Sequence, residues 1–151
     1  MQSQFMKVRD VLCNVLAVSA GLLAGMGLNM SLITLNTSVL FPAPAGIDMN
    51  DGQAFNAYIE SLPTEAFLVV LLAHLVQSFV GGWIAARLAA SRPMALALTI
   101  GIFSLLGGVM AMTMITGPAW LMVELPLYLV VAWLAGRIEV RRRFGLDSSA
   151  T

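Results

Sequence analysis

The length of its uncharged segments constrains this chain more than any other feature, because each segment is long enough to cross a bilayer. No charged residue occurs between Asp10 and Asp48. Lipid offers the backbone no hydrogen-bond partners, so a crossing segment must form a helix of about 20 mainly apolar residues. Four segments meet this requirement: 11–35, 66–86, 93–115 and 118–136.

The composition agrees with a membrane location. Hydrophobic residues make up 59% of the 151 residues and charged residues 11%, whereas soluble domains are nearer half apolar and a quarter charged. This excess excludes disorder, a nucleic-acid-binding module and an ordinary cytosolic enzyme. The single cysteine excludes an internal disulfide and a zinc cluster. We therefore expect one all-α integral membrane domain over 1–151, an antiparallel bundle of four transmembrane helices.

The positions of the charges predict the orientation. The basic residues precede the first span, separate the second from the third, and follow the fourth: Lys7 and Arg9, Arg87 and Arg92, and Arg137, Arg141, Arg142 and Arg143. Basic flanks stay in the cytoplasm, so we expect both termini inside, a basic cytoplasmic tail over 137–151, and a bacterial-type inner (plasma) membrane. Cleavage of a signal peptide near Ala20 is the alternative at the N-terminus. The apolar run continues well beyond that point, which favours a retained first helix.

The loop over 36–65 is the longest predicted external segment, and its first part is rich in proline. Asp48, Asn50 and Asp51 can cap the N-terminus of a helix, and the residues that follow predict a short amphipathic helix over 53–61. We expect this helix on the membrane surface or over the mouth of the bundle. Calcium binding by the acidic run is the alternative. However, the spacing is one residue too short for an EF-hand loop, and the downstream bidentate Glu is absent.

Small residues recur at helical spacing along the predicted spans, and helices in lipid approach one another closely at such positions. The predicted packing positions are Gly21 and Gly25, Ser78 and Gly82, and Gly101 and Gly108. They indicate either close packing within one bundle or a seam between copies of the chain. Their number exceeds what a four-helix monomer needs, which favours self-association.

A few polar residues fall inside the predicted spans, mainly in the outer half of the membrane. The candidate ligand or ion residues are His74, Glu124, Asn29, Gln77 and Tyr128. A charged carboxylate at the bilayer centre costs about 2.5–3.5 kcal/mol on insertion scales, so we expect Glu124 to be protonated or paired with a donor such as His74. Pro126 is expected to kink the helix beside Glu124. The cluster is either a hydrogen bond that fixes helix register or an outward-facing site for a proton, cation or polar ligand.

The sequence contains no motif for catalysis, so we expect no enzyme, no cofactor and no metal site. Soft-metal binding by methionines with His74 is the alternative, although methionine also fills apolar gaps. The leading hypothesis is a small non-catalytic inner-membrane protein that associates with itself, a membrane partner subunit or lipid. A proton- or cation-linked carrier or channel with its site at His74 and Glu124 is the first alternative, and a binder of lipid or another hydrophobic ligand is the second. Arg141, Arg142 and Arg143 are expected either to contact lipid headgroups or only to set the topology.

Overall fold

The computed structural model describes residues 2–48 and 50–148, and it confirms an all-α bundle with four helices long and apolar enough to cross a membrane. The long helices are α1 (Gln2–Leu35), α3 (Thr64–Leu88), α4 (Pro93–Met114) and α5 (Glu124–Ser148). Three short elements join them: the π-helical turn η1 (Asn36–Leu40), the helix α2 (Gly52–Ser61) and the 3-10 turn η2 (Ala119–Val123).

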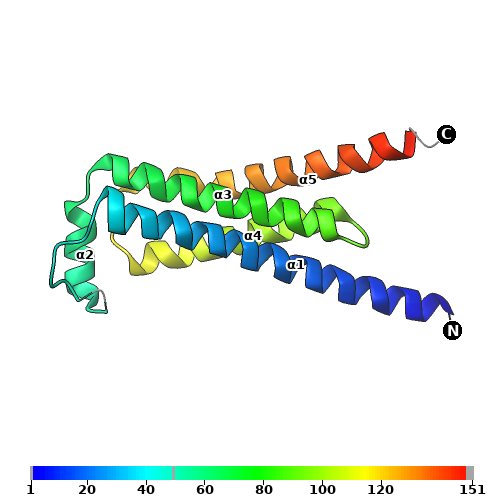
Figure 1. Ribbon diagram of the computed structural model, residues 1–151, viewed down its shortest axis with the longest axis horizontal. Helices are drawn as coiled ribbons and strands as arrows, with labels where there is room; N and C mark the ends of the chain where they lie inside the picture. Colours follow the sequence, from blue (N-terminus) through cyan, green and yellow to red (C-terminus); the bar gives the residue numbers. More distant parts are fainter. Residues whose placement is uncertain (1, 49, 149–151) are drawn as a thin grey trace.

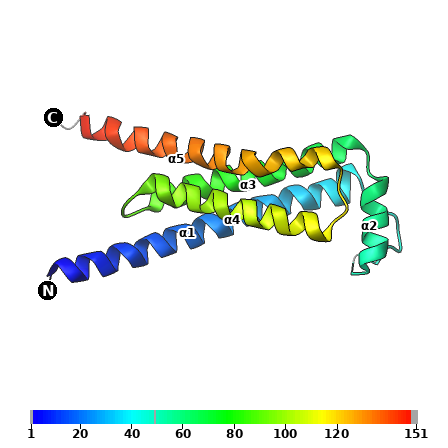
Figure 2. The same cartoon turned by 180° about the vertical axis from the view of Figure 1, so that it is seen from behind.

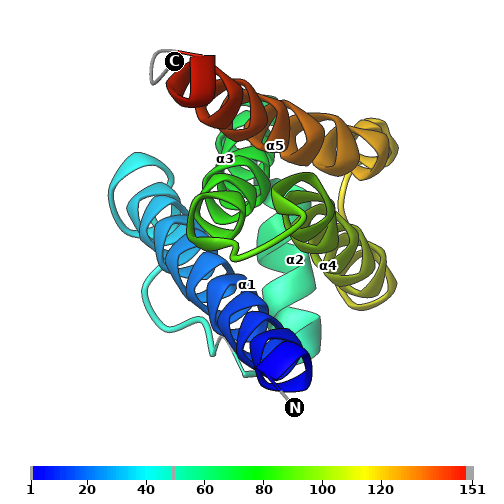
Figure 3. The ribbon, with the colours of Figure 1, turned by 90° about the vertical axis from the view of Figure 1, so that its right-hand side faces the viewer.

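The helix α3 is the central element of the bundle. Seen along the bundle, it lies between α1 on one side and α4 and α5 on the other (Figure 3). α4 and α5 also pack against each other, whereas α1 contacts the rest of the bundle mainly through α3. The two chain ends lie at the same end of the molecule, and α2 crosses the opposite end (Figure 1). This arrangement agrees with an even number of membrane crossings.

Two glycines of α1 bring its backbone against the backbone of α3. A Cβ atom at Gly25 would lie 2.6 Å from the carbonyl oxygen of Gln77, and one at Gly21 would overlap the carbonyl oxygen of Gly81. The two helices run antiparallel, so a step of four residues forward along α1 corresponds to a step of four residues back along α3. Gly21 therefore faces Gly81, and Gly25 faces Gln77. A side chain of any size at either glycine would therefore force the helices apart.

Small residues form the seams among α3, α4 and α5 in the same way. A Cβ atom at Gly101 would lie 2.7 Å from the Cβ of Ala132, and one at Gly108 would lie 2.7 Å from the ring of Tyr128. Gly82 faces the backbone of α5 at Ala132. The packing within one chain therefore explains all these small-residue faces, and their number no longer argues for self-association.

Two helices extend further than the predicted membrane spans. α1 already begins at Gln2, and α5 continues through residues 137–148, which the sequence assigns to a tail; residues 149–151 of that tail lie outside the described part. Both extensions pass beyond the turn between α3 and α4 and diverge from each other (Figure 2). The backbone hydrogen bonds of a helix are satisfied in water as well as in lipid, so the membrane surface does not end it.

The chain changes helix type beside Glu124, where the sequence predicts a kink. α5 begins at Glu124 after the 3-10 turn η2, so Pro126 lies in the first turn of the helix. A proline has no clash and loses no hydrogen bond at that position, because the first N–H groups of a helix have no partner within it. The predicted position of an irregularity beside Glu124 thus coincides with a change from 3-10 to α-helix, and a kink at this junction stays a prediction.

The loop between α1 and α3 is fastened by side-chain hydrogen bonds of α2 and of the residue that caps it. Asp51 caps the helix by accepting a backbone N–H at 2.9 Å, as predicted. Tyr58 is buried and donates its hydroxyl to the carbonyl oxygen of Phe41 at 2.9 Å. Burial raises the pKa of the Tyr58 hydroxyl, which keeps the donor proton in place. Asn56 accepts the backbone N–H of Thr116 at 2.8 Å and so ties α2 to the turn between α4 and α5.

At the opposite end of the bundle, Asn14 ties α1 to the turn between α3 and α4. Its side-chain oxygen accepts the backbone N–H groups of Ala90 at 3.0 Å and Ser91 at 3.3 Å. Its side-chain nitrogen donates to the hydroxyl of Ser91 at 2.9 Å. α1 is thus fixed to the bundle by a polar contact below its two packing glycines.

Candidate functional site

His74 of α3 and Glu124 of α5 form a direct hydrogen bond inside the membrane-spanning part of the bundle. The distance from Nδ1 of His74 to Oε2 of Glu124 is 2.8 Å. The pairing occurs because α3 and α5 pack side by side and each carries its polar residue at the same level. The prediction that Glu124 finds its donor in His74 is therefore confirmed as a contact.

The two partners differ strongly in their access to the surroundings. The side chain of Glu124 is 2% exposed, whereas that of His74 is 24% exposed. If the carboxylate is ionised, Nδ1 of His74 donates to it; if it is protonated, its hydroxyl donates to Nδ1. Either proton arrangement satisfies the buried Oε2 atom, and the imidazole is the more accessible partner of the pair.

Ser78 and Tyr128 extend the contact between α3 and α5 by one turn. The hydroxyl of Ser78 donates to the backbone oxygen of Tyr128 at 3.0 Å, and both residues are buried. The ring of Tyr128 lies against the imidazole of His74, with 6.2 Å between the ring centroids. Tyr128 therefore belongs to the site, as predicted from its spacing to Glu124.

Asn29 and Ser104 bring polar side chains from the other two spans. Asn29 lies one turn above Gly25 on the face of α1 that contacts α3, which places it level with Ala73 and His74. Ser104 lies between Gly101 and Gly108 on α4, the two glycines that contact Tyr128. Both residues are buried, and the Nδ2 atom of Asn29 and the hydroxyl of Ser104 have no hydrogen-bond partner among the described residues.

These observations define the polar cluster of α3 and α5, whose members contact one another: His74, Ser78, Glu124 and Tyr128. Asn29 of α1 and Ser104 of α4 are buried on the faces that pack against these two helices. Gln77 does not join the cluster, because its backbone and side chain face α1 at Gly25. The sequence marks Ser104 as a small residue of the α4 face, but its burial without a partner emerges only from the structure. Buried polar atoms without partners commonly hold a water or an ion.

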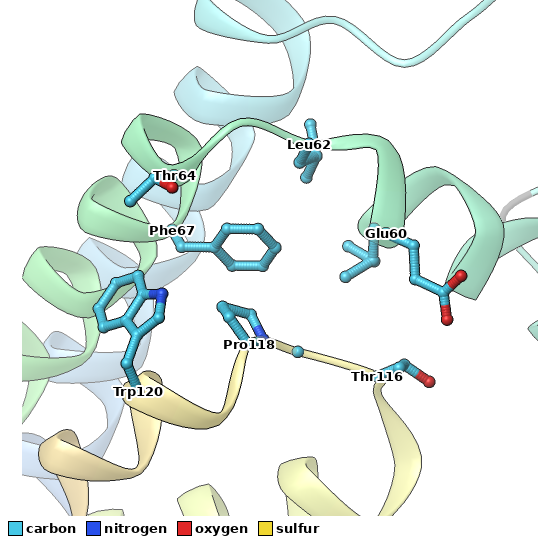
Figure 4. A pocket seen from close by; sticks show the side chains of 9 residues that line it. Glu60, Leu62, Thr64, Phe67, Thr116, Pro118 and Trp120 are labelled. Carbon is cyan, nitrogen blue, oxygen red and sulfur yellow. The ribbon is translucent and has the colours of Figure 1, made fainter.

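Two cavities lie beside α2, at the end of the bundle opposite the chain termini. One, of about 300 Å³, lies between the end of α2 and the start of α3. Its wall contains the rings of Phe67, Pro118 and Trp120, and Glu60 and Thr116 stand at its rim (Figure 4). The other, of about 490 Å³, is a mainly apolar space between α2 and α4. His74 and Glu124 line neither of these two cavities.

Comparison with known protein families, curated proteins and solved structures finds no match. The site must therefore be interpreted from its own geometry. The methionines do not converge on His74, since several of them are more than half exposed on the outside of the bundle: Met26, Met30, Met110, Met114 and Met122.

A second polar group, which sequence reasoning missed, lies at the basic end of the bundle. Glu139 of α5 is 0% exposed and contacts three arginines: Arg87 of α3 and Arg142 and Arg143 of α5. Arg142 and Arg143 are therefore engaged with an acid, whereas Arg141 between Val140 and Arg142 is exposed. The spacing of three and four residues from Glu139 to these two arginines is a helical ion-pair signal that is present in the sequence.

Proposed function

We propose that the protein is a non-catalytic membrane bundle that associates with a second copy of itself through the outer face of α1. The observation that supports this proposal is a second row of small residues on α1, offset around the helix from the Gly21 and Gly25 face that contacts α3. Its members are spaced four, three and four residues apart: Ala20, Ala24, Gly27 and Ser31. Gly27 and Ser31 are exposed, and a Cβ atom at Gly27 would meet nothing within 4 Å.

A helix face that touches only lipid has no need of small residues. Glycine in a helix costs about 0.5–1 kcal/mol relative to alanine, and lipid accepts bulky apolar side chains without cost. Small residues do favour association where another helix approaches, because they let the two backbones come close.

The test measures energy transfer between chains labelled at Cys13, which is exposed and is the only cysteine. Donor- and acceptor-labelled proteins are mixed in liposomes, and transfer is followed as lipid dilutes the protein. We expect transfer in the unaltered chain, its loss in Gly27→Leu, and its retention in Gly107→Leu. Gly107 on α4 is a matched control, because a Cβ atom there also meets nothing within 4 Å. Absence of transfer in the unaltered chain would overturn the proposal.

A proton- or cation-linked carrier is the second candidate, and the accessible imidazole of His74 favours it. His74 is 24% exposed and stands in front of the buried Glu124. The unpartnered atoms of Asn29 and Ser104 provide places for water in the same part of the bundle. Reconstituted vesicles should then show a pH-dependent flux that Glu124→Gln abolishes. If the unaltered protein carries no protons, small cations or organic cations, this candidate fails.

A further inference from the structure

Glu139 gathers arginines from two spans into one group at the basic end of the bundle. Its Oε2 atom lies 2.8 Å from Nε of Arg142 and 3.5 Å from Nη1 of Arg87, and its Oε1 atom lies 3.1 Å from Nε of Arg143. Arg143 also donates to backbone carbonyl oxygens at the end of α3, at 2.7 Å to Ala86. The buried carboxylate therefore holds the end of α3 and the extension of α5 together.

The group keeps an excess of positive charge. Three guanidinium groups share one carboxylate, which leaves two positive charges. Each arginine side chain also remains partly exposed: 44% for Arg87, 40% for Arg142 and 32% for Arg143. A guanidinium has five N–H donors, so the two oxygens of Glu139 cannot occupy all the donors of three arginines. The unoccupied donors remain on the accessible side of the group.

The position of the group matches the level of lipid headgroups. It lies in the last turn of α3, and on α5 it lies about two turns beyond Trp133, whose ring is stacked by Arg137 at 4.8 Å. Tryptophan and arginine are typical of the membrane–water interface. The distribution of basic residues predicts that this end faces the cytoplasm, where anionic lipids give the leaflet a negative surface potential.

We propose that Arg87, Arg142 and Arg143 form a binding site for the phosphate of an anionic phospholipid headgroup. Guanidinium groups bind phosphate oxygens through paired, charge-assisted hydrogen bonds. Glu139 acts as a positioning residue, because its charge allows three arginines to converge before the lipid arrives. The site differs from the basic run expected from the sequence, since it excludes Arg141 and includes Arg87 from another helix. This inference does not depend on association through α1.

The test compares two variants that remove the same charge. Arg87→Gln removes the arginine with the longest contact to Glu139 and is therefore the change that least disturbs the fold, whereas Arg141→Gln removes an arginine outside the group. Native mass spectrometry of protein in detergent measures the binding of added phosphatidylglycerol, with phosphatidylcholine, a zwitterionic lipid of zero net charge, as the comparison. We expect Arg87→Gln to weaken binding of phosphatidylglycerol at least fivefold and Arg141→Gln to weaken it less than twofold.

Other outcomes would overturn the proposal. Equal losses in both variants would mean diffuse attraction, and no loss in Arg87→Gln would mean that the group does not bind lipid. Displacement of the lipid by millimolar glycerol phosphate or inorganic phosphate would mean a site for soluble anions. If Arg87→Gln fails to fold, Arg142→Lys is compared with Arg141→Lys instead. Both changes keep the charge, and only the first loses paired hydrogen bonds within the group. Energy transfer at Cys13 is measured on the same variants, so a failure of the lipid site is distinguished from a failure of association.

Discussion

The close approach of α1 and α3 can be tested by adding one methyl group at Gly25. A Cβ atom there would lie 2.6 Å from the carbonyl oxygen of Gln77, whereas ordinary contacts begin at 3.4 Å. The helices must therefore separate by about 0.8 Å or distort, and overpacking of this kind costs about 1–3 kcal/mol. The matched control is Gly27→Ala, two residues away on the same helix, where a Cβ atom meets nothing within 4 Å.

The comparison of these two variants isolates the free-energy cost of the close contact between α1 and α3. Both substitutions gain the same helix propensity of about 0.5–1 kcal/mol, so the difference in their free energies of unfolding reports only the contact with α3. Unfolding is followed by tryptophan fluorescence during titration with sodium dodecyl sulfate, at a protein concentration low enough to keep the chain monomeric. We expect Gly25→Ala to be less stable than Gly27→Ala by about 1–3 kcal/mol. Free energies of unfolding that agree within about 0.3 kcal/mol for the two variants would refute the close contact between α1 and α3.

Three further predictions concern polar contacts. A double-mutant cycle with His74→Leu and Glu124→Leu should give a coupling energy of about 0.6 to 1.7 kcal/mol in detergent unfolding, the range for hydrogen bonds between membrane helices; additive effects would exclude the contact. Asn14→Ala should lower the free energy of unfolding by about 1–2 kcal/mol because it loses bonds to the α3–α4 turn, and Asn14→Asp, which keeps the acceptor, should lose less. Tyr58→Phe should cost about 1 kcal/mol through loss of the bond to Phe41. Because burial raises the pKa of Tyr58 above 10, its stabilising contribution is complete below pH 10 and declines as the pH rises further. Thermal unfolding between pH 8 and 11 should therefore show a steeper decline in the unaltered chain than in the variant.

The spans and the main polar contact were predictable because lipid neither pairs with the backbone nor stabilises an unpaired charge. A long uncharged segment must be helical, and a carboxyl group at the depth of Glu124 must be protonated or find a donor. His74 was the one ionisable residue expected at the same depth, so its contact with Glu124 followed from counting residues along two helices. The capping of α2 by Asp51 was equally predictable, since a cap bonds to backbone N–H groups within three residues of it.

Features that depend on which surfaces meet could not be predicted in the same way. Gly21 and Gly25 have the same appearance in the sequence whether they contact α3 or another copy of the chain. Glu139 was missed because it lies among arginines beyond the apolar segment, where acids are usually solvated; its burial requires Arg87, which is far away in sequence. The start of α5 at Glu124 depends on the tertiary position of the preceding turn rather than on Pro126 alone.

α1 contacts the rest of the bundle mainly through α3, and this has a consequence for how the molecule assembles during synthesis. Gly21 leaves the ribosome sixty residues before its contact Gly81, which at about 5–20 residues per second corresponds to a delay of about 3–12 s. Throughout this interval the first helix is in the bilayer without the surface that it later covers. Any protein that offers a matching groove during those seconds competes directly with the chain's own third helix.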